Sequence, residues 1–137
     1  MEIYMNGKIN ISAGFITMGL FMLYGFLLIY LRDFAPNAQE WVNSYSTGKH
    51  FEARLAHVHG NLFAFLNIVI GFLLLHFKNE LRNIKSISIL SLVGILMPIG
   101  ILLEIYLGLS PLFVIVGALS MTLSVFGIGY EFYKRTF

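Results

Sequence analysis

Polar side chains that can bind a metal or an anion gather at the start of one long apolar segment, in the sequence ARLAHVHGNLFAFLN at residues 53–67. At about 100° per residue, Arg54, His57 and Asn61 fall on one face of a helix, whereas His59 points nearly the opposite way. Ionisable side chains are costly to place inside a membrane and are usually paired or functional. The spacing therefore marks His57 as the first candidate ligand, with His59 as the alternative.

The spacing of the histidines also indicates which metal they suit. Because i,i+2 positions on a regular helix do not face each other, His57 and His59 are not expected to chelate one ion. His50 and His76 stand at opposite ends of the same segment, and the chain contains no cysteine. A structural zinc site needs about four ligands. A haem iron needs one neutral imidazole and apolar surface for the porphyrin, so the pattern favours haem b.

Two charged residues are expected to support such a ligand. Arg54, one turn from His57, is positioned to pair with a haem propionate near the membrane surface, and Lys49 is a second cation for that role. Glu104, at a similar depth in a later segment, is expected to pair with Arg54 or to accept the Nδ1 proton of His57. The alternative is an arginine–glutamate pair that only ties helices together, with the histidines as packing residues.

Membrane helices must position these residues, because 58% of the 137 residues are hydrophobic and only 12% are charged. Four segments are long enough to cross a hydrocarbon core of about 30 Å. The predicted fold is therefore all-α, an integral membrane four-helix bundle in a single domain over residues 1–137. The predicted helices cover residues 9–31, 51–76, 84–106 and 112–133. A net charge of +2 is too small to argue for nucleic acid.

Lysine and arginine beside the predicted spans set the orientation. They are more numerous on one side (Lys8, Lys78, Arg82, Lys85, Lys134 and Arg135) than on the other (Arg32, Lys49 and Arg54). Positive charge favours the inner face, which predicts a multi-pass protein of the cell inner membrane with both termini in the cytoplasm. The connection over residues 32–50 is then an outer interfacial loop that caps the bundle.

Small residues indicate how the helices pack, since membrane helices gain little from hydrophobicity and must approach closely. They recur in the first segment (Gly14, Gly19, Gly25), the second (Ala56, Gly60, Ala64) and the fourth (Gly117, Ser120, Ser124, Gly127). Pro98, four residues after Gly94, predicts a kink in the third helix, either simply tolerated or opening a pocket beside the second. Four helices enclose little volume, so a large ligand is expected near a subunit interface of a homo-oligomer.

Several of these features resemble the styrene oxide isomerase family of small four-helix membrane haem b proteins. They are the stretch GKHFEARLAHVHGN, the glycines of the first segment, the pair Ser110 and Pro111, and IGY near the end. The resemblance implies a homotrimer with haem b between subunits, bound by the second-helix histidine, here His57. It further implies that ferric iron acts as a Lewis acid on a small apolar epoxide and yields an aldehyde or ketone.

The family's other site residues carry over in part. Where the family has an asparagine six residues after its histidine, this chain has Phe63, and Asn61 is the amide that shares the face of His57. The resemblance also implies a substrate-placing tyrosine on the third helix, where Tyr106 is the only tyrosine. Two other functions stay open: a non-catalytic haem protein for gas binding or electron transfer, with His59 of a neighbouring subunit as sixth ligand, and a haem-free structural membrane protein.

Overall fold

The computed structural model describes residues 2–134, with side chains from residue 7 onward, so Arg135, counted above among the flanking cations, lies outside the described residues. Its helices are α1 (Glu2–Asp33), α2 (Ala38–Asn43), α3 (Lys49–His76), α4 (Ile84–Gly94), α5 (Leu96–Leu107) and α6 (Leu112–Tyr133). Four long apolar stretches, the third formed by α4 and α5 together, could span a membrane. The chain is thus an all-α, multi-pass membrane protein with four candidate spans, as its sequence predicts.

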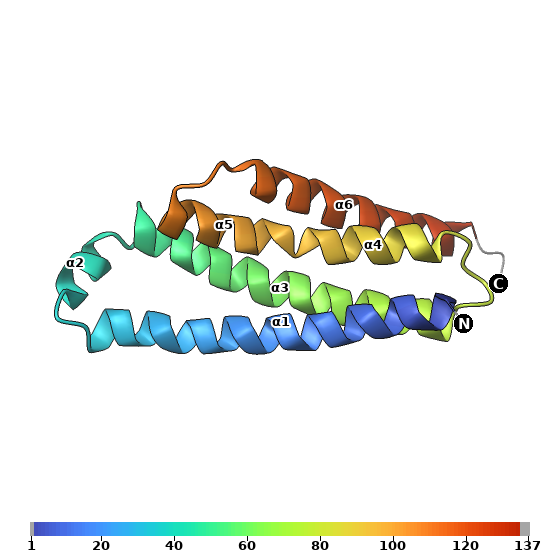
Figure 1. The fold of residues 1–137 in the computed structure, drawn as a ribbon, viewed down its shortest axis with the longest axis horizontal. Coiled ribbons are helices and arrows are strands. Elements are labelled where there is room, and N and C mark those ends of the chain that lie inside the picture. Colours follow the sequence, from blue (N-terminus) through green and yellow to red (C-terminus); the bar gives the residue numbers. More distant parts are fainter. Residues whose placement is uncertain (1, 135–137) are drawn as a thin grey trace.

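The long helices run alongside one another, with α3 between α1 and the α4–α5 pair, and with α6 on the α4–α5 pair (Figure 1). The short helix α2 lies at one end of the bundle, within the predicted capping loop. α1 begins and α6 ends at the opposite end (Figure 1). The described ends of the chain therefore lie on the same side, as four crossings require.

Glycines allow α1 and α3 to approach closely. A Cβ on Gly60 would lie 2.3 Å from the ring of Phe21, and one on Gly14 would lie 2.7 Å from the backbone oxygen of Ala64. Such approach lets van der Waals contact hold helices together in lipid. The small-residue contact predicted for these helices is confirmed at Gly14, Gly60 and Ala64. The expectation for Gly19 is wrong, because it is exposed on α1 and has open space where a Cβ would stand.

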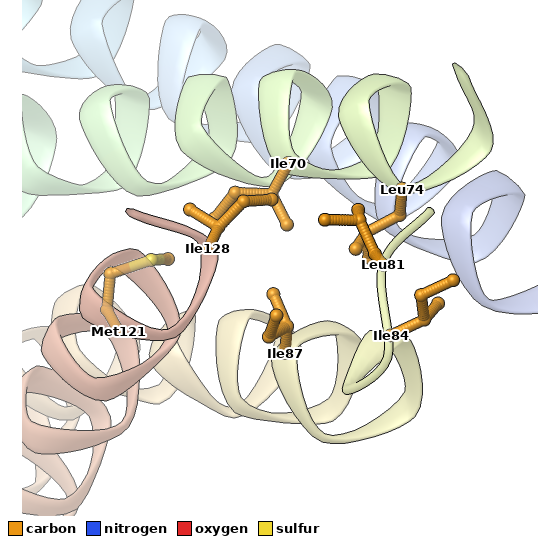
Figure 2. Packing of buried hydrophobic residues seen from close by; sticks show 7 residues of the cluster. All are labelled: Ile70, Leu74, Leu81, Ile84, Ile87, Met121 and Ile128. Atoms are coloured by element: carbon orange, nitrogen blue, oxygen red, sulfur yellow. The ribbon is translucent and has the colours of Figure 1, made fainter. Parts of the chain in front are cut away.

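Apolar side chains fill the bundle at the end away from α2, where α3, α4 and α6 converge (Figure 2). The buried members are Ile70, Leu74, Leu81, Ile84, Ile87, Met121 and Ile128. A smaller buried cluster near α2 contains Ala53, Ala56, Ile101 and Ile105. The residues singled out for chemistry lie at the sparser of these two ends, along α3.

The third membrane segment is two helices rather than one kinked helix. α4 ends at Gly94 and α5 begins at Leu96, two residues before Pro98. Proline lacks an N–H group and clashes with the carbonyl four residues earlier, which is that of Gly94. The N–H of Ile95 donates to the oxygen of Leu92 at 3.1 Å, a tighter turn than an α-helix. Pro98 is fully buried, which favours a packed bend over an opened pocket.

Candidate functional site

His57 lies in the seam between α3 and α1, where a backbone carbonyl fixes its ring. Its Nδ1 is 2.9 Å from the backbone oxygen of Phe21. Because a carbonyl only accepts, Nδ1 carries the proton of the neutral ring and Nε2 keeps its lone pair. The ring lies over Gly25, where a Cβ would come within 2.7 Å of Cε1. The seam thus orients the imidazole, and among the described residues its Nε2 has no hydrogen-bond partner.

An open apolar groove of about 340 Å³ adjoins His57. α1 supplies the rest of its lining, which is Met22, Gly25, Phe26, Leu28 and Ile29. Met22 and Phe26 are 57% and 66% exposed, so the groove opens on the outer, lipid-facing surface of the single chain. The groove is open to this surface, so a flat apolar ligand lying in it would keep one face uncovered by the chain.

Asn61 lies on the same face as His57, which confirms the helical spacing. Its Nδ2 donates to the backbone oxygen of His57 at 2.8 Å and lies 3.5 Å from the Nδ1 atom of that ring. The amide is thereby held within α3, one turn below the imidazole. Among the described residues no donor reaches the side-chain oxygen of Asn61, which leaves an acceptor beside the ring.

His59 belongs to a different face of α3. Its Nδ1 lies 2.8 Å from the backbone oxygen of Leu55, and its ring meets that of Phe63 edge-on at 6.2 Å. The same reasoning leaves its Nε2 unprotonated, but the two histidines are not brought together. In the part of the chain that the structure describes, no group of three His, Asp or Glu side chains could hold a metal ion.

Arg54 and Glu104 do not meet. The guanidinium of Arg54 lies 3.8 Å from the centre of the Tyr45 ring and donates to the Tyr45 oxygen at 3.4 Å. Glu104 is exposed on α5, and between residues 7 and 134 it forms no ion pair with Arg54 and no hydrogen bond with His57. The expected pairing of Glu104 is therefore wrong. Arg54 contacts Tyr45 in the α2–α3 connection instead, and the backbone oxygen of Phe21 accepts the hydrogen bond from Nδ1 of His57.

Tyr106 lies in a different cavity from His57. Its hydroxyl is 3.0 Å from that of Tyr24, and the residue lines a cavity near α2 that also contains Lys49. That cavity shares no lining residue with the groove beside His57. Of the predicted site residues, the structure brings together His57 and Asn61, and it leaves Tyr106 apart from them.

A buried polar network in the bundle is the principal feature that sequence reasoning missed. Nδ2 of Asn10 lies 3.0 Å from Oδ1 of Asn67 and 2.6 Å from Oγ of Ser91, and Asn67 donates to the Ser91 backbone oxygen at 2.8 Å. The hydroxyl of Ser88 donates to Asn10, and all four residues are at most 1% exposed. Because these groups satisfy one another, the network joins α1, α3 and α4 rather than forming a ligand site. The available signal was an asparagine among apolar residues in each of two helices, Asn10 in α1 and Asn67 in α3.

Comparisons of the chain with protein-family models, with curated proteins and with solved structures give no match. A function is therefore inferred from the residues and geometry of this chain. The two features that bear on it are the orientation of the His57 ring and the apolar groove beside it.

Proposed function

We propose that the chain is a membrane haem b protein with His57 as axial ligand, and that it isomerises small apolar epoxides to aldehydes or ketones. The observation that carries the proposal is the state of the His57 ring. The Phe21 carbonyl holds its Nδ1 proton and leaves Nε2 free beside an apolar groove. Histidines that bind metals commonly donate their other ring proton in this way.

The residues present fit a haem group in three respects. One oriented imidazole meets the need of haem iron, whereas a zinc site needs more ligands than α3 gathers. The groove is lined by aliphatic, aromatic and thioether side chains, which suit a porphyrin face. Arg54 donates one N–H in a long hydrogen bond to the Tyr45 backbone oxygen, and its other N–H groups can bind a carboxylate such as a haem propionate.

Haem iron, when bound, supplies Lewis acidity that polarises the oxygen of an epoxide. The chain's own residues have the complementary tasks. His57 holds a fixed orientation through Phe21 and Gly25. Met22 and Phe26 keep the groove apolar and so exclude water that would open the epoxide to a diol. Asn61, predicted as a catalytic residue, adjoins the ring, and in this proposal its side-chain oxygen would orient the substrate by hydrogen bonding.

Assembly and orientation complete the proposal. Because the groove is open on the surface of a single copy, a homo-oligomer would enclose the haem, and the family resemblance favours a trimer. The excess of lysine and arginine at the end where α1 begins supports cytoplasmic termini in the cell inner membrane. Apolar epoxides would enter from the bilayer, onto which the groove opens.

The test is the absorbance of detergent-purified protein produced with ample haem. The native chain is expected to show a Soret band that His57→Ala removes, while His76→Ala, at an exposed histidine far along α3, retains it. Gly25→Ala keeps the imidazole but displaces its ring, because the added methyl would stand 2.7 Å from Cε1, so this variant should also lose haem. A Soret band that persists in both seam variants would show that His57 is not the ligand.

The isomerase activity needs its own assay. Haem-loaded protein given styrene oxide should release phenylacetaldehyde, and Asn61→Leu should lower the rate without removing the Soret band. Haem-loaded protein that yields no carbonyl compound from several epoxides would refute the activity and leave haem binding intact.

Two alternatives have specific support. The free Nε2 of His59 on another face favours a non-catalytic haem protein, in which a neighbouring copy completes six-coordination. A low-spin spectrum insensitive to added ligands would support that function. The satisfied network around Asn67 shows that this chain uses polar groups for assembly. Colourless protein from haem-rich cells would favour a structural role for the histidines as well.

A further inference from the structure

A cavity of about 420 Å³, whose lining carries both polar and apolar side chains, lies at the α2 end of the bundle, apart from the groove beside His57. Its lining includes Leu31 in the last turns of α1, Glu40 and Trp41 of α2, Lys49 at the start of α3, and Tyr106 near the end of α5. We name it the α2 cavity. Because three membrane helices end around it, it lies at the depth of lipid headgroups.

Trp41, one of the residues that line the α2 cavity, carries a buried donor that no described residue satisfies. Nε1 of Trp41 is buried and has no hydrogen-bond partner within residues 7–134. The indole is held in place, since it stacks on His50 with ring centres 4.8 Å apart while the Trp41 oxygen accepts from Ser44 at 2.9 Å. Buried donors normally have an acceptor. An unpaired N–H on a residue of the cavity lining therefore favours a ligand that brings an oxygen acceptor.

Opposite charges line the same cavity without neutralising each other. Lys49 and Glu40 are both exposed there, and in the described part of the chain neither forms an ion pair. A simple anion would meet the repulsion of Glu40, and a simple cation that of Lys49. A ligand that carries an anionic and a cationic group complements both residues.

We propose that the α2 cavity binds the headgroup of an amine-bearing phospholipid of the phosphatidylethanolamine class. The phosphate accepts hydrogen bonds from Lys49 and from the Trp41 indole, and the ammonium donates to the Glu40 carboxylate. Leu31 and the exposed Leu27 of α1 receive the first part of the acyl chains, as in any bilayer contact. This inference is independent of the proposed haem function.

Trp41 provides the assay because it is the only tryptophan of the chain. Dihexanoyl phosphatidylethanolamine titrated into detergent-solubilised protein should change the Trp41 emission saturably. Lys49→Gln and Glu40→Gln should each weaken binding about tenfold, as expected for loss of one charge-assisted hydrogen bond. Both side chains are exposed, so neither change threatens folding. Glu52→Gln, on α3 near Lys49 but outside the cavity lining, is the matched control and should bind as the native chain does.

Two further ligands distinguish an amine-bearing phospholipid from other phosphate-containing ligands. Dihexanoyl phosphatidylglycerol, which lacks the amine, should bind more weakly than the ethanolamine lipid, and inorganic phosphate should leave the emission unchanged. Equal binding of phosphatidylglycerol, or a response to free phosphate, would overturn the assignment of an amine-bearing lipid. A lipid response that neither Lys49→Gln nor Glu40→Gln weakens would place the lipid elsewhere and overturn the site itself.

Discussion

Replacement of Asn67 by leucine tests whether the buried network holds the bundle together. Leucine has a similar size and suits an apolar helix, so packing is largely conserved while the amide is lost. Two hydrogen bonds to other helices disappear with it. One is accepted from Asn10 at 3.0 Å, and the other is donated to the backbone oxygen of Ser91 at 2.8 Å.

The magnitude follows from these two bonds. Hydrogen bonds between membrane helices contribute ~0.6 kcal/mol on average and at most ~1.7 kcal/mol, so two of them contribute ~1–3 kcal/mol. The bond to Ser91 should lie at the upper end. In a regular helix the N–H of Ile95 would donate to the Ser91 oxygen, but here it donates to Leu92 at the helix break. The Asn67 side chain therefore donates to the Ser91 oxygen in place of the backbone N–H of Ile95. We expect Asn67→Leu to lower the free energy of unfolding by ~2–3 kcal/mol.

The free energy of unfolding is measured by titration with sodium dodecyl sulfate in mixed micelles, followed by circular dichroism. Asn61→Leu is the matched control, since that amide donates within α3 only, to the oxygen of His57 at 2.8 Å. It should change the unfolding free energy by less than ~0.5 kcal/mol. A neutral Asn67→Leu, or one no more destabilised than Asn61→Leu, would refute the view that this network joins the helices.

Two further predictions concern the packing of α6. Gly117→Ala should destabilise the chain by ~1–3 kcal/mol, because the methyl would stand 2.1 Å from the backbone nitrogen of Met97, while Gly129→Ala, with open space around it, should be neutral or stabilising; the same unfolding titration compares them. Glu131→Gln should lower the free energy of unfolding by ~1–2 kcal/mol, since this buried carboxylate accepts hydrogen bonds from Arg82 and Asn83, just before α4 begins, whereas Glu104→Gln, at an exposed residue, should have no measurable effect. Equal unfolding curves for either pair would count against the contact concerned.

The sequence predicts the four membrane segments well because their signal is bulk hydrophobicity over about 20 residues. The fourth predicted segment, residues 112–133, has the same bounds as α6, and the second differs from α3 by two residues at its start. The third segment was less predictable. Proline fixes where regular hydrogen bonding must fail, but whether the chain bends or divides into two helices depends on what packs beside it, which no local pattern records.

Only those features of the candidate site that lie within a single helix could be predicted from the sequence. The periodicity of α3 places Asn61 beside His57 and turns His59 away, as the structure has it. The hydrogen-bond partner of the imidazole could not be predicted in this way. It is the backbone carbonyl of Phe21 on another helix, and every residue type has such a carbonyl, so the sequence does not indicate which one is used. A carboxylate at matching depth, Glu104, was the natural sequence-based choice, although depth does not fix which way a helix faces.

The polar residues of the bundle differ in how many of their hydrogen-bonding groups find a partner within the chain. This difference bears on whether a residue serves helix assembly or ligand binding. Asn10 and Asn67 exchange hydrogen bonds with each other and with α4, so the cost of their burial is met inside the chain. His57 uses one ring nitrogen on the chain and leaves the other beside a groove. A histidine needed for packing alone would gain nothing from that free nitrogen at membrane depth, where an unpaired polar atom is unfavourable. The proposed haem ligand would account for the orientation of this ring, which the packing of α1 against α3 does not require.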